Sequence, residues 1–205
     1  MDIVVKDLGK QFQEEWIFRN LDFHFQQGKK YAIIGPNGSG KSTLLQILSG
    51  FLLQSKGIVT YQDTENTFQP EHFYQYITVS TPYTELIEEF TAIELLNFHF
   101  QFKKKRFEGD MIDFLDRIEL AHAATKQVKN FSSGMKQRMK LGLAFFSDAP
   151  IVLLDEPTTN LDSTGISWYQ DLVNGESDQR LVIICSNQTY EYEQADGQLN
   201  ILDYK

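Results

Sequence analysis

Short apolar runs, separated by glycines and polar turns, set the pattern of this chain. Residues 31–34 are apolar without interruption and end at Gly35, which predicts a buried strand. The next apolar positions recur at helical spacing and stop at Gly50: they are Leu44, Leu45, Ile47 and Leu48. A strand, a glycine-rich loop and a helix are therefore predicted in direct succession.

Similar runs predict the other elements. We expect strands at residues 3–5, 21–25, 57–61, 76–79, 151–154, 181–184 and 199–202. Residues 62–71 are polar and turn-rich, and helical spacing is expected over residues 93–130, after Ser132 and around Trp168. Apolar runs without alternation suit a mostly parallel sheet covered on both faces.

The loop after the first buried strand carries a phosphate-binding pattern. Its residues match G-x-x-x-x-G-K-[ST] at every specified position: Gly35, Pro36, Asn37, Gly38, Ser39, Gly40, Lys41 and Ser42. Glycines let backbone N–H groups turn inward, and the following helix adds its positive end. Lys41 is expected to reach the β- and γ-phosphates, Ser42 to bind Mg²⁺ and Thr43 to contact phosphate. A plain turn is the alternative, but it requires no lysine after the last glycine.

Two carboxylates end the apolar run at residues 151–154. Asp155 is placed to hold Mg²⁺ directly or through water, and Glu156 to orient and deprotonate an attacking water. A charged turn at a strand end is the common alternative. It weakens if this strand joins the phosphate loop in one sheet.

Composition narrows the class of protein. The 205 residues carry a net charge of −9, which argues against a general nucleic-acid binder. Cys185 is the single cysteine, so no internal disulfide can form, and a reducing compartment is expected. No apolar run has the length of a membrane span, and the start of the chain predicts no secretion signal. A membrane function would need a separate spanning chain.

Four segments together resemble the nucleotide-binding domain of ATP-binding cassette (ABC) transporters. Residues 35–43 resemble the Walker A motif, and residues 151–156 resemble the Walker B motif followed by the catalytic glutamate. Residues 159–162 resemble the D-loop, with Asp162 as its acid. Residues 131–138 resemble the signature segment, which many other phosphate-loop ATPases lack. The resemblance covers essentially the whole chain.

The resemblance implies an α/β fold of the P-loop NTPase type. Its RecA-like core would have a mostly parallel sheet, with an N-terminal antiparallel β subdomain and an inserted α-helical subdomain. Residues 1–205 would form a single ABC ATPase domain, with a core at about 1–82 and 150–205 and a helical lobe at about 83–149. It also implies a head-to-tail dimer that encloses two ATP molecules.

The signature segment departs from the usual L-S-G-G-Q. Ser132 is a good N-cap for the next helix, Ser133 replaces the first glycine, and Gly134 permits close approach. Met135 replaces the glutamine and removes a polar group. The helix N-terminus at Ser132, Ser133 and Gly134 is expected to face the γ-phosphate held by the other subunit.

Two further departures concern hydrolysis. Pro82 stands where the family has the Q-loop glutamine, and proline offers no side-chain ligand; Thr81 or Thr84 are possible substitutes. Asn187 stands where the family has a histidine facing the γ-phosphate, and it can hydrogen-bond phosphate without carrying a proton. Slow hydrolysis driven mainly by Glu156 is the expected result.

Two smaller features leave alternatives open. Phe12 occupies the place of the aromatic side chain that stacks on adenine, with Trp16 as the competing candidate. Residues 103–106 are Lys-Lys-Lys-Arg, expected to be a solvated loop, with contact to anionic lipid or a partner as the alternative.

The leading hypothesis is an ATP-binding and hydrolysing subunit that powers an ABC transporter through ATP-dependent dimerisation. Its cofactors would be ATP and Mg²⁺. Its partners would be a membrane-spanning subunit on a separate chain and a second ABC subunit, identical or not, with no nucleic acid. The location would be peripheral, on the cytoplasmic face of the membrane. The alternatives are a soluble ABC-type ATPase and a nucleotide-sensing module with little hydrolysis.

Overall fold

The computed structural model describes residues 1–63, 67–68 and 74–205. Most of the expected polar turn at residues 62–71, and His72, lie outside this part. The chain divides into two compact units: one contains Met1–Val79, Ala149–Glu156 and Ser177–Lys205, and the other contains Ser80–Asp148 and Pro157–Glu176.

The first unit begins with an antiparallel sheet. Its strands run in the order β2 (Glu15–Phe25), β1 (Asp2–Phe12), β4 (Lys56–Gln62) and β5 (Thr67–Phe68). The expected strands at residues 3–5 and 21–25 are confirmed, but each is only the most apolar part of an eleven-residue strand. The polar remainder is held by cross-strand pairing, with irregularities in register after Val5 and Leu8. The predicted N-terminal antiparallel subdomain is thus confirmed.

A second sheet in the same unit carries the buried runs. Its order is β6 (Ile77–Ser80), β7 (Ile151–Asp155), β8 (Leu181–Ser186), β3 (Lys30–Ile34) and β9 (Gly197–Asn200). β3 pairs in parallel with β8 and β9, and β7 pairs in parallel with β8. Every residue of β7 and β8 is buried, as unbroken apolar runs predict.

The last expected strand is wrong in its second half. β9 ends at Asn200, and Ile201–Tyr204 forms a 3₁₀ helix. The Asn200 side chain accepts a hydrogen bond from Leu202 N at 3.1 Å, so it caps a turn where an extended strand was expected.

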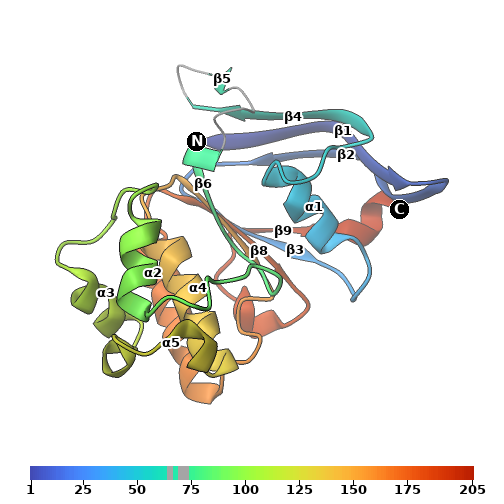
Figure 1. Cartoon of the computed structure of the whole chain (residues 1–205). Coiled ribbons are helices and arrows are strands. Elements are labelled where there is room, and N and C mark those ends of the chain that lie inside the picture. Colours follow the sequence, from blue (N-terminus) through green and yellow to red (C-terminus); the bar gives the residue numbers. More distant parts are fainter. Residues whose placement is uncertain (64–66, 69–73) are drawn as a thin grey trace. The chain divides into compact units, whose positions relative to one another are not determined.

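Helix α1 (Lys41–Leu48) lies between the two sheets of the first unit (Figure 1). Its apolar face, which includes Leu44 and Leu48, joins one core with side chains of both sheets, among them Ile3 and Ile183. Because this core fixes α1 against β3, it also fixes the loop that joins them.

The second unit is helical. It contains α2 (Ala92–His99), α3 (Met111–Arg117), α4 (Ser133–Phe146) and α5 (Ser163–Glu176). In the part of the chain that the structure describes, this unit also has 3₁₀ helices at Ala121–Ala123 and Val128–Asn130. The first unit has others at Thr189–Glu191 and Ile201–Tyr204. In the described ranges, no helix has the length and apolar character needed to cross a membrane.

The expected helical stretch at residues 93–130 is correct in type but too long. Capping boxes start α2 at Thr91 and α3 at Asp110. The segment between them folds around packed rings, and Phe107 and Phe146 each lie within about 6 Å of Phe114. These apolar side chains fill a core without continuing the helix.

Candidate functional site

The phosphate-loop pattern lies where β3 passes into α1, as predicted. Gly40 has φ of 107°, and a Cβ there would come within 2.6 Å of Ile17 Cγ2. A Cβ on Gly35 would come within 2.7 Å of Ser39 Oγ. The loop therefore depends on glycine at both positions, for backbone conformation and for space.

Lys41 is held inside this loop. Its side chain is buried, and Nζ donates hydrogen bonds to Gly35 O at 2.9 Å and Pro36 O at 3.1 Å. Thr43, in the first turn of α1, is half-buried. The Ser39 hydroxyl is buried and has no hydrogen-bond partner among the described residues. A cationic group and free donors thus meet at the positive end of α1, an arrangement suited to an anion.

Asp155 ends β7 next to Ser42, whose hydroxyl hydrogen-bonds its carboxylate. Burial raises the pKa of Asp155, and the charge of Glu156 adds to this rise, while Ser42 and Lys41 oppose it. Within the described part of the chain, the buried Oδ1 has no hydrogen-bond partner. A buried carboxylate oxygen left unpaired is costly, which marks it as available to a cation.

These residues fit Mg²⁺. The cation prefers oxygen ligands and usually combines one or two protein groups with waters and substrate phosphates. The described residues contain no cluster of three or more His, Cys, Asp or Glu side chains that could hold a metal alone. The Ser42 hydroxyl and the Asp155 carboxylate match such a partial ligand set.

Glu156 and Asn187 follow neighbouring strands. Glu156 has φ of 44°, and its N–H donates to Cys185 O at 2.9 Å, which turns the chain out of β7. Asn187 Nδ2 donates to Asn37 Oδ1 at 3.0 Å, so the end of β8 is tied to the phosphate loop. Cys185 is fully buried, and burial raises the pKa of its thiol, so it is not a reactive group.

The two aromatic candidates belong to the β1–β2 hairpin. Phe12 is 47% exposed, and Lys10 Nζ lies 4.7 Å from its ring centroid. Trp16 is half-buried, and its Cζ3 lies 2.8 Å from the position a Cβ would take on Gly9. Phe12 therefore presents the more open ring, while Trp16 covers a glycine in the hairpin.

The second unit holds the signature residues. Ser132 caps α4, and its Oγ accepts a hydrogen bond from Met135 N at 3.2 Å. A cavity of about 360 Å³ opens at this helix end, and Ser133, Gly134 and Asp162 line it. Asp162 Oδ1 accepts hydrogen bonds from Gly165 N and Thr164 Oγ1, both at 2.8 Å, and these bonds lower its pKa. The structure thus joins the predicted signature and D-loop residues in one cavity.

Sequence reasoning placed Gln137 and Arg138 in the signature segment but missed their partners. Gln137 is buried and donates to Pro157 O at 2.7 Å. Arg138 pairs with Glu119 at 2.9 Å and lies 4.7 Å from the Trp168 ring centroid. The sequence places Gln137 and Arg138 on the predicted helix after Ser132. It does not reveal their partners, because these are distant in the sequence and no motif links them.

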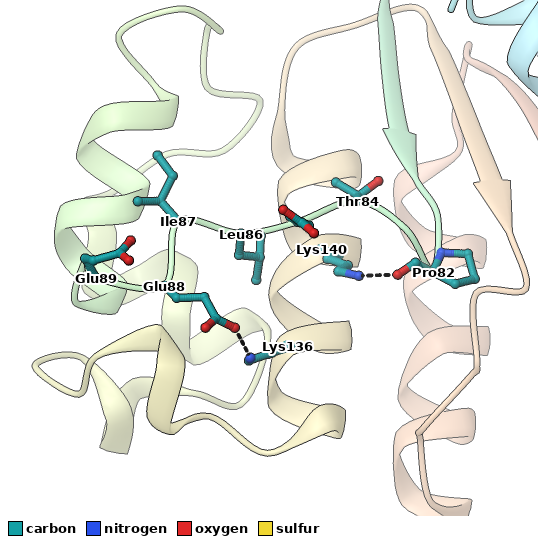
Figure 2. Close-up of a pocket in the computed structure, with 9 residues that line it drawn as sticks. Pro82, Thr84, Leu86, Ile87, Glu88, Glu89, Lys136 and Lys140 are labelled. Carbon is teal, nitrogen blue, oxygen red and sulfur yellow. Dashed lines mark hydrogen bonds and ion pairs between the residues drawn. The ribbon is translucent and has the colours of Figure 1, made fainter.

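Pro82 lines a second cavity of the same unit, of about 680 Å³ (Figure 2). Lys140 Nζ donates to Pro82 O at 3.1 Å and to Thr81 O at 3.3 Å. The Thr81 and Thr84 hydroxyls lie 3.0 Å apart and hydrogen-bond each other. Lys136 forms an ion pair with Glu88 at the other side of this cavity (Figure 2). A lysine from α4, which no motif signalled, therefore holds the loop at the Q-loop position.

The chain matches known proteins along most of its length. The family model described as "ABC transporter" matches residues 18–159. The ABC transporter ATP-binding protein YybJ of Bacillus subtilis, itself uncharacterized, is 30% identical over 90% of this chain and 84% of its own length.

Solved structures share the fold. An ABC transporter ATP-binding protein from Pyrococcus furiosus matches with a TM-score of 0.85 at 21% identity over the full length of both chains. MJ0796, a bacterial ABC transporter cassette solved as a dimer, matches with a TM-score of 0.78 at 22% identity over 97% of this chain and 94% of its own.

These matches confirm the predicted P-loop NTPase fold and the predicted resemblance. Members of the matched family bind and hydrolyse ATP, pair with membrane-spanning subunits and dimerise. The chain accordingly belongs to the ABC transporter family, as an ATP-binding ATPase subunit.

Proposed function

We propose that the first unit binds the triphosphate of ATP through its glycine loop. Gly35, Asn37, Gly38, Ser39, Gly40 and Thr43 would supply the donors around the phosphates. Lys41 would exchange its loop carbonyls for phosphate oxygens. Asn187 would add a hydrogen bond from its amide, and Phe12 would stack on the adenine.

Ser42 and Asp155 would hold Mg²⁺, which neutralises charge on the β- and γ-phosphates when bound. The observation that carries the proposal is the unpaired, buried Oδ1 of Asp155 beside Ser42 and Lys41. Glu156 would orient an attacking water and take its proton.

The second unit would act on the nucleotide of another subunit. Ser132, Ser133 and Gly134 would present the N-terminus of α4 to the partner's γ-phosphate, and Asp162 would hold the adjoining D-loop by capping α5. ATP binds this helix end better than ADP because only ATP carries the γ-phosphate. Such a difference makes dimer closure depend on the nucleotide.

Turnover would be slow. Pro82 provides no side chain for the attacking water, its loop is held by Lys140, and Asn187 cannot carry a proton. We expect a kcat below the enzyme median of about 10 per second.

The ATPase would act at the membrane. Residues 1–205 would form a single ABC ATPase domain on the cytoplasmic face, peripherally bound through a membrane-spanning subunit on a separate chain. The helical lobe would span about residues 83–149. The net charge of −9 gives no support to nucleic acid as a partner.

Comparing the chain with Glu156→Gln tests this function. The variant is expected to bind ATP and dimerise, as measured by light scattering, while hydrolysis falls at least about 100-fold. Glu193→Gln, an exposed glutamate, is the matched control and should hydrolyse normally. Equal hydrolysis by all three proteins would show that Glu156 takes no part in catalysis.

A further inference from the structure

The loop that follows α2 exposes aromatic rings beside a basic run. Phe102 is 72% exposed and Phe98 is 40% exposed, and their ring centroids lie 5.2 Å apart. Residues 103–106 follow directly and are all basic. We call Phe98, Phe102 and residues 103–106 the lysine–phenylalanine surface. Large exposed rings next to clustered cations mark an interaction site more often than a plain solvated face.

A hollow of about 760 Å³ opens at this surface. Phe100, Phe102 and Phe107 line it together with Lys103, Lys104 and Lys105. A lining that combines apolar rings with cations matches a molecule that has an anionic head and an apolar tail.

The cations are held in position. Lys105 Nζ donates to Gly109 O at 2.8 Å and lies 5.3 Å from the Phe107 ring centroid. Lys103 is half-buried, and burial lowers its pKa, so a nearby anion would favour its charged form. Lys104 is exposed. Lys105 therefore needs little further ordering when an anion arrives.

Nearby carboxylates oppose part of this charge: backbone hydrogen bonds lower the pKa of Asp110, and the charge of Lys105 helps to lower it. Asp110 accepts hydrogen bonds from Ile112 N and Asp113 N, and Asp113 accepts one from Asp110 N, so both serve the start of α3. Glu108 is a further acidic side chain within the loop. Residues 103–113 hold four basic and three acidic side chains, so a net charge of +1 remains here on a chain whose net charge is −9.

We propose that the lysine–phenylalanine surface binds the anionic headgroups of a lipid bilayer. Phe98 and Phe102 enter the interfacial region, and the lysines contact lipid phosphates. The proposal rests on the proposed function for the subunit's place beside a membrane. Paired aromatic rings with consecutive lysines favour lipid over an acidic protein segment, because they suit a fluid layer of phosphate and acyl chain.

Vesicle flotation with the full chain tests this proposal. Vesicles of phosphatidylcholine alone are compared with vesicles that also contain phosphatidylglycerol. Binding is expected only to the anionic vesicles and should weaken as salt is raised. Each lysine near an anionic surface contributes about fivefold, so Lys104→Gln with Lys105→Gln should weaken binding about 25-fold. Phe102→Ser should weaken binding about tenfold without changing charge.

Matched control variants test whether the loss of any two lysines, or of any exposed ring, would weaken vesicle binding equally. Lys126→Gln with Lys129→Gln removes the same charge from exposed positions of the same unit and should bind vesicles normally. Phe51→Ser removes an exposed ring of the first unit and should also bind normally. Equal losses in the loop and control variants would overturn the proposal, as would equal binding to both kinds of vesicle.

Two further readouts complete the test. ATP affinity should be the same in the loop variants and the unaltered chain. If none of these proteins bound ATP, the result would count against the proposed function and not against lipid binding by the lysine–phenylalanine surface. If the loop variants bind vesicles normally but no longer co-purify with the membrane-spanning subunit in detergent, the surface binds protein and the lipid proposal is wrong.

Discussion

The two units differ in the burial and hydrogen bonding of their functional polar groups. In the first unit, Lys41 and Asp155 are buried, with 5% and 3% exposure, and the Asp155 carboxylate keeps an oxygen unpaired. In the second unit, Ser132 and Asp162 hydrogen-bond the helix starts next to them. In the first unit, the unpaired buried carboxylate oxygen costs folding free energy, and a bound ligand would remove that cost. In the second unit, the capping groups are hydrogen-bonded within the unit itself and need no ligand. Removing Lys41 in the first unit should therefore abolish ATP binding, whereas substitutions at the signature residues of the second unit should alter only the coupling between subunits.

Lys41→Ala should give the largest effect. It removes the ammonium at the centre of the loop, and hydrogen bonds to charged groups contribute about 1.5–3 kcal/mol each. We expect ATP affinity to fall at least about 100-fold, as measured by titration calorimetry. ATP-dependent dimerisation should be lost with it.

Lys140→Ala is the matched control for Lys41→Ala. It also removes an ammonium that donates to two carbonyl groups, but in the second unit. ATP affinity of the isolated subunit should be unchanged. If both variants lost affinity equally, the contrast between the units would be wrong.

Gly134→Val tests the second unit and should lower hydrolysis without lowering ATP affinity. A Cβ at this position would lie 3.1 Å from Asn160 O, and the added methyl groups would enter the 360 Å³ cavity at the signature helix. We expect hydrolysis to fall about 100-fold, since one lost set of phosphate donors costs about that much. ATP affinity of the monomer should change less than about twofold, because the substituted residue belongs to the unit without the phosphate loop.

Gly175→Val serves as the control for Gly134→Val. It makes the same substitution in α5, where an added Cβ meets no atom within 4 Å. Hydrolysis should be retained, apart from a small loss of stability from helix propensity. Loss of monomer affinity in Gly134→Val would mean that the signature residues act within their own subunit.

The two units also differ in how much of each could be predicted from the sequence. Gly35 and Lys41 belong to one short motif between a strand and a helix, so their placement follows from local pattern. Neither the donation from Lys140 to Pro82 O nor that from Gln137 to Pro157 O could be predicted, because these residues are far apart in sequence and no periodicity links them. The β1–β2 hairpin was underestimated because its outer half is polar and held by strand pairing.

Asn187→His with Pro82→Gln should restore the family pattern at two positions. A histidine next to Asn37 can transfer a proton, and a glutamine can contact the attacking water. We expect kcat to rise about tenfold, at or below the low end of what a positioned acid–base group contributes. Single-turnover measurements at saturating ATP would report the chemical step. An unchanged rate would show that another step limits hydrolysis, such as dimer closure.

In the absence of nucleotide, Asp155→Asn should give the smallest change of all, a gain in the stability of the folded chain. Burial raises the pKa of Asp155 in the folded protein, so the folded state binds this proton more tightly than the unfolded chain does. The stabilisation is complete below the ordinary pKa of aspartate and is lost as pH rises through the raised value. Once the pH is above the raised value, the native chain carries a buried ionised carboxylate, which the neutral amide of the variant replaces. The variant should hydrolyse no ATP yet melt about 2–4 °C higher, for a gain of about 1 kcal/mol.

The pH dependence of that gain separates electrostatics from packing. The difference in melting temperature between Asp155→Asn and the unaltered chain should shrink as pH falls from the raised pKa of Asp155 to the ordinary pKa of aspartate, because the aspartate side chain then becomes neutral like the amide. Mg²⁺ with ATP should raise the melting temperature of the unaltered chain and not that of the variant. Asp171→Asn, an exposed position in α5, should melt like the unaltered chain at every pH. A lower melting temperature for Asp155→Asn at neutral pH would mean that the carboxylate is fully paired, and that the first unit carries no cost for a ligand to relieve.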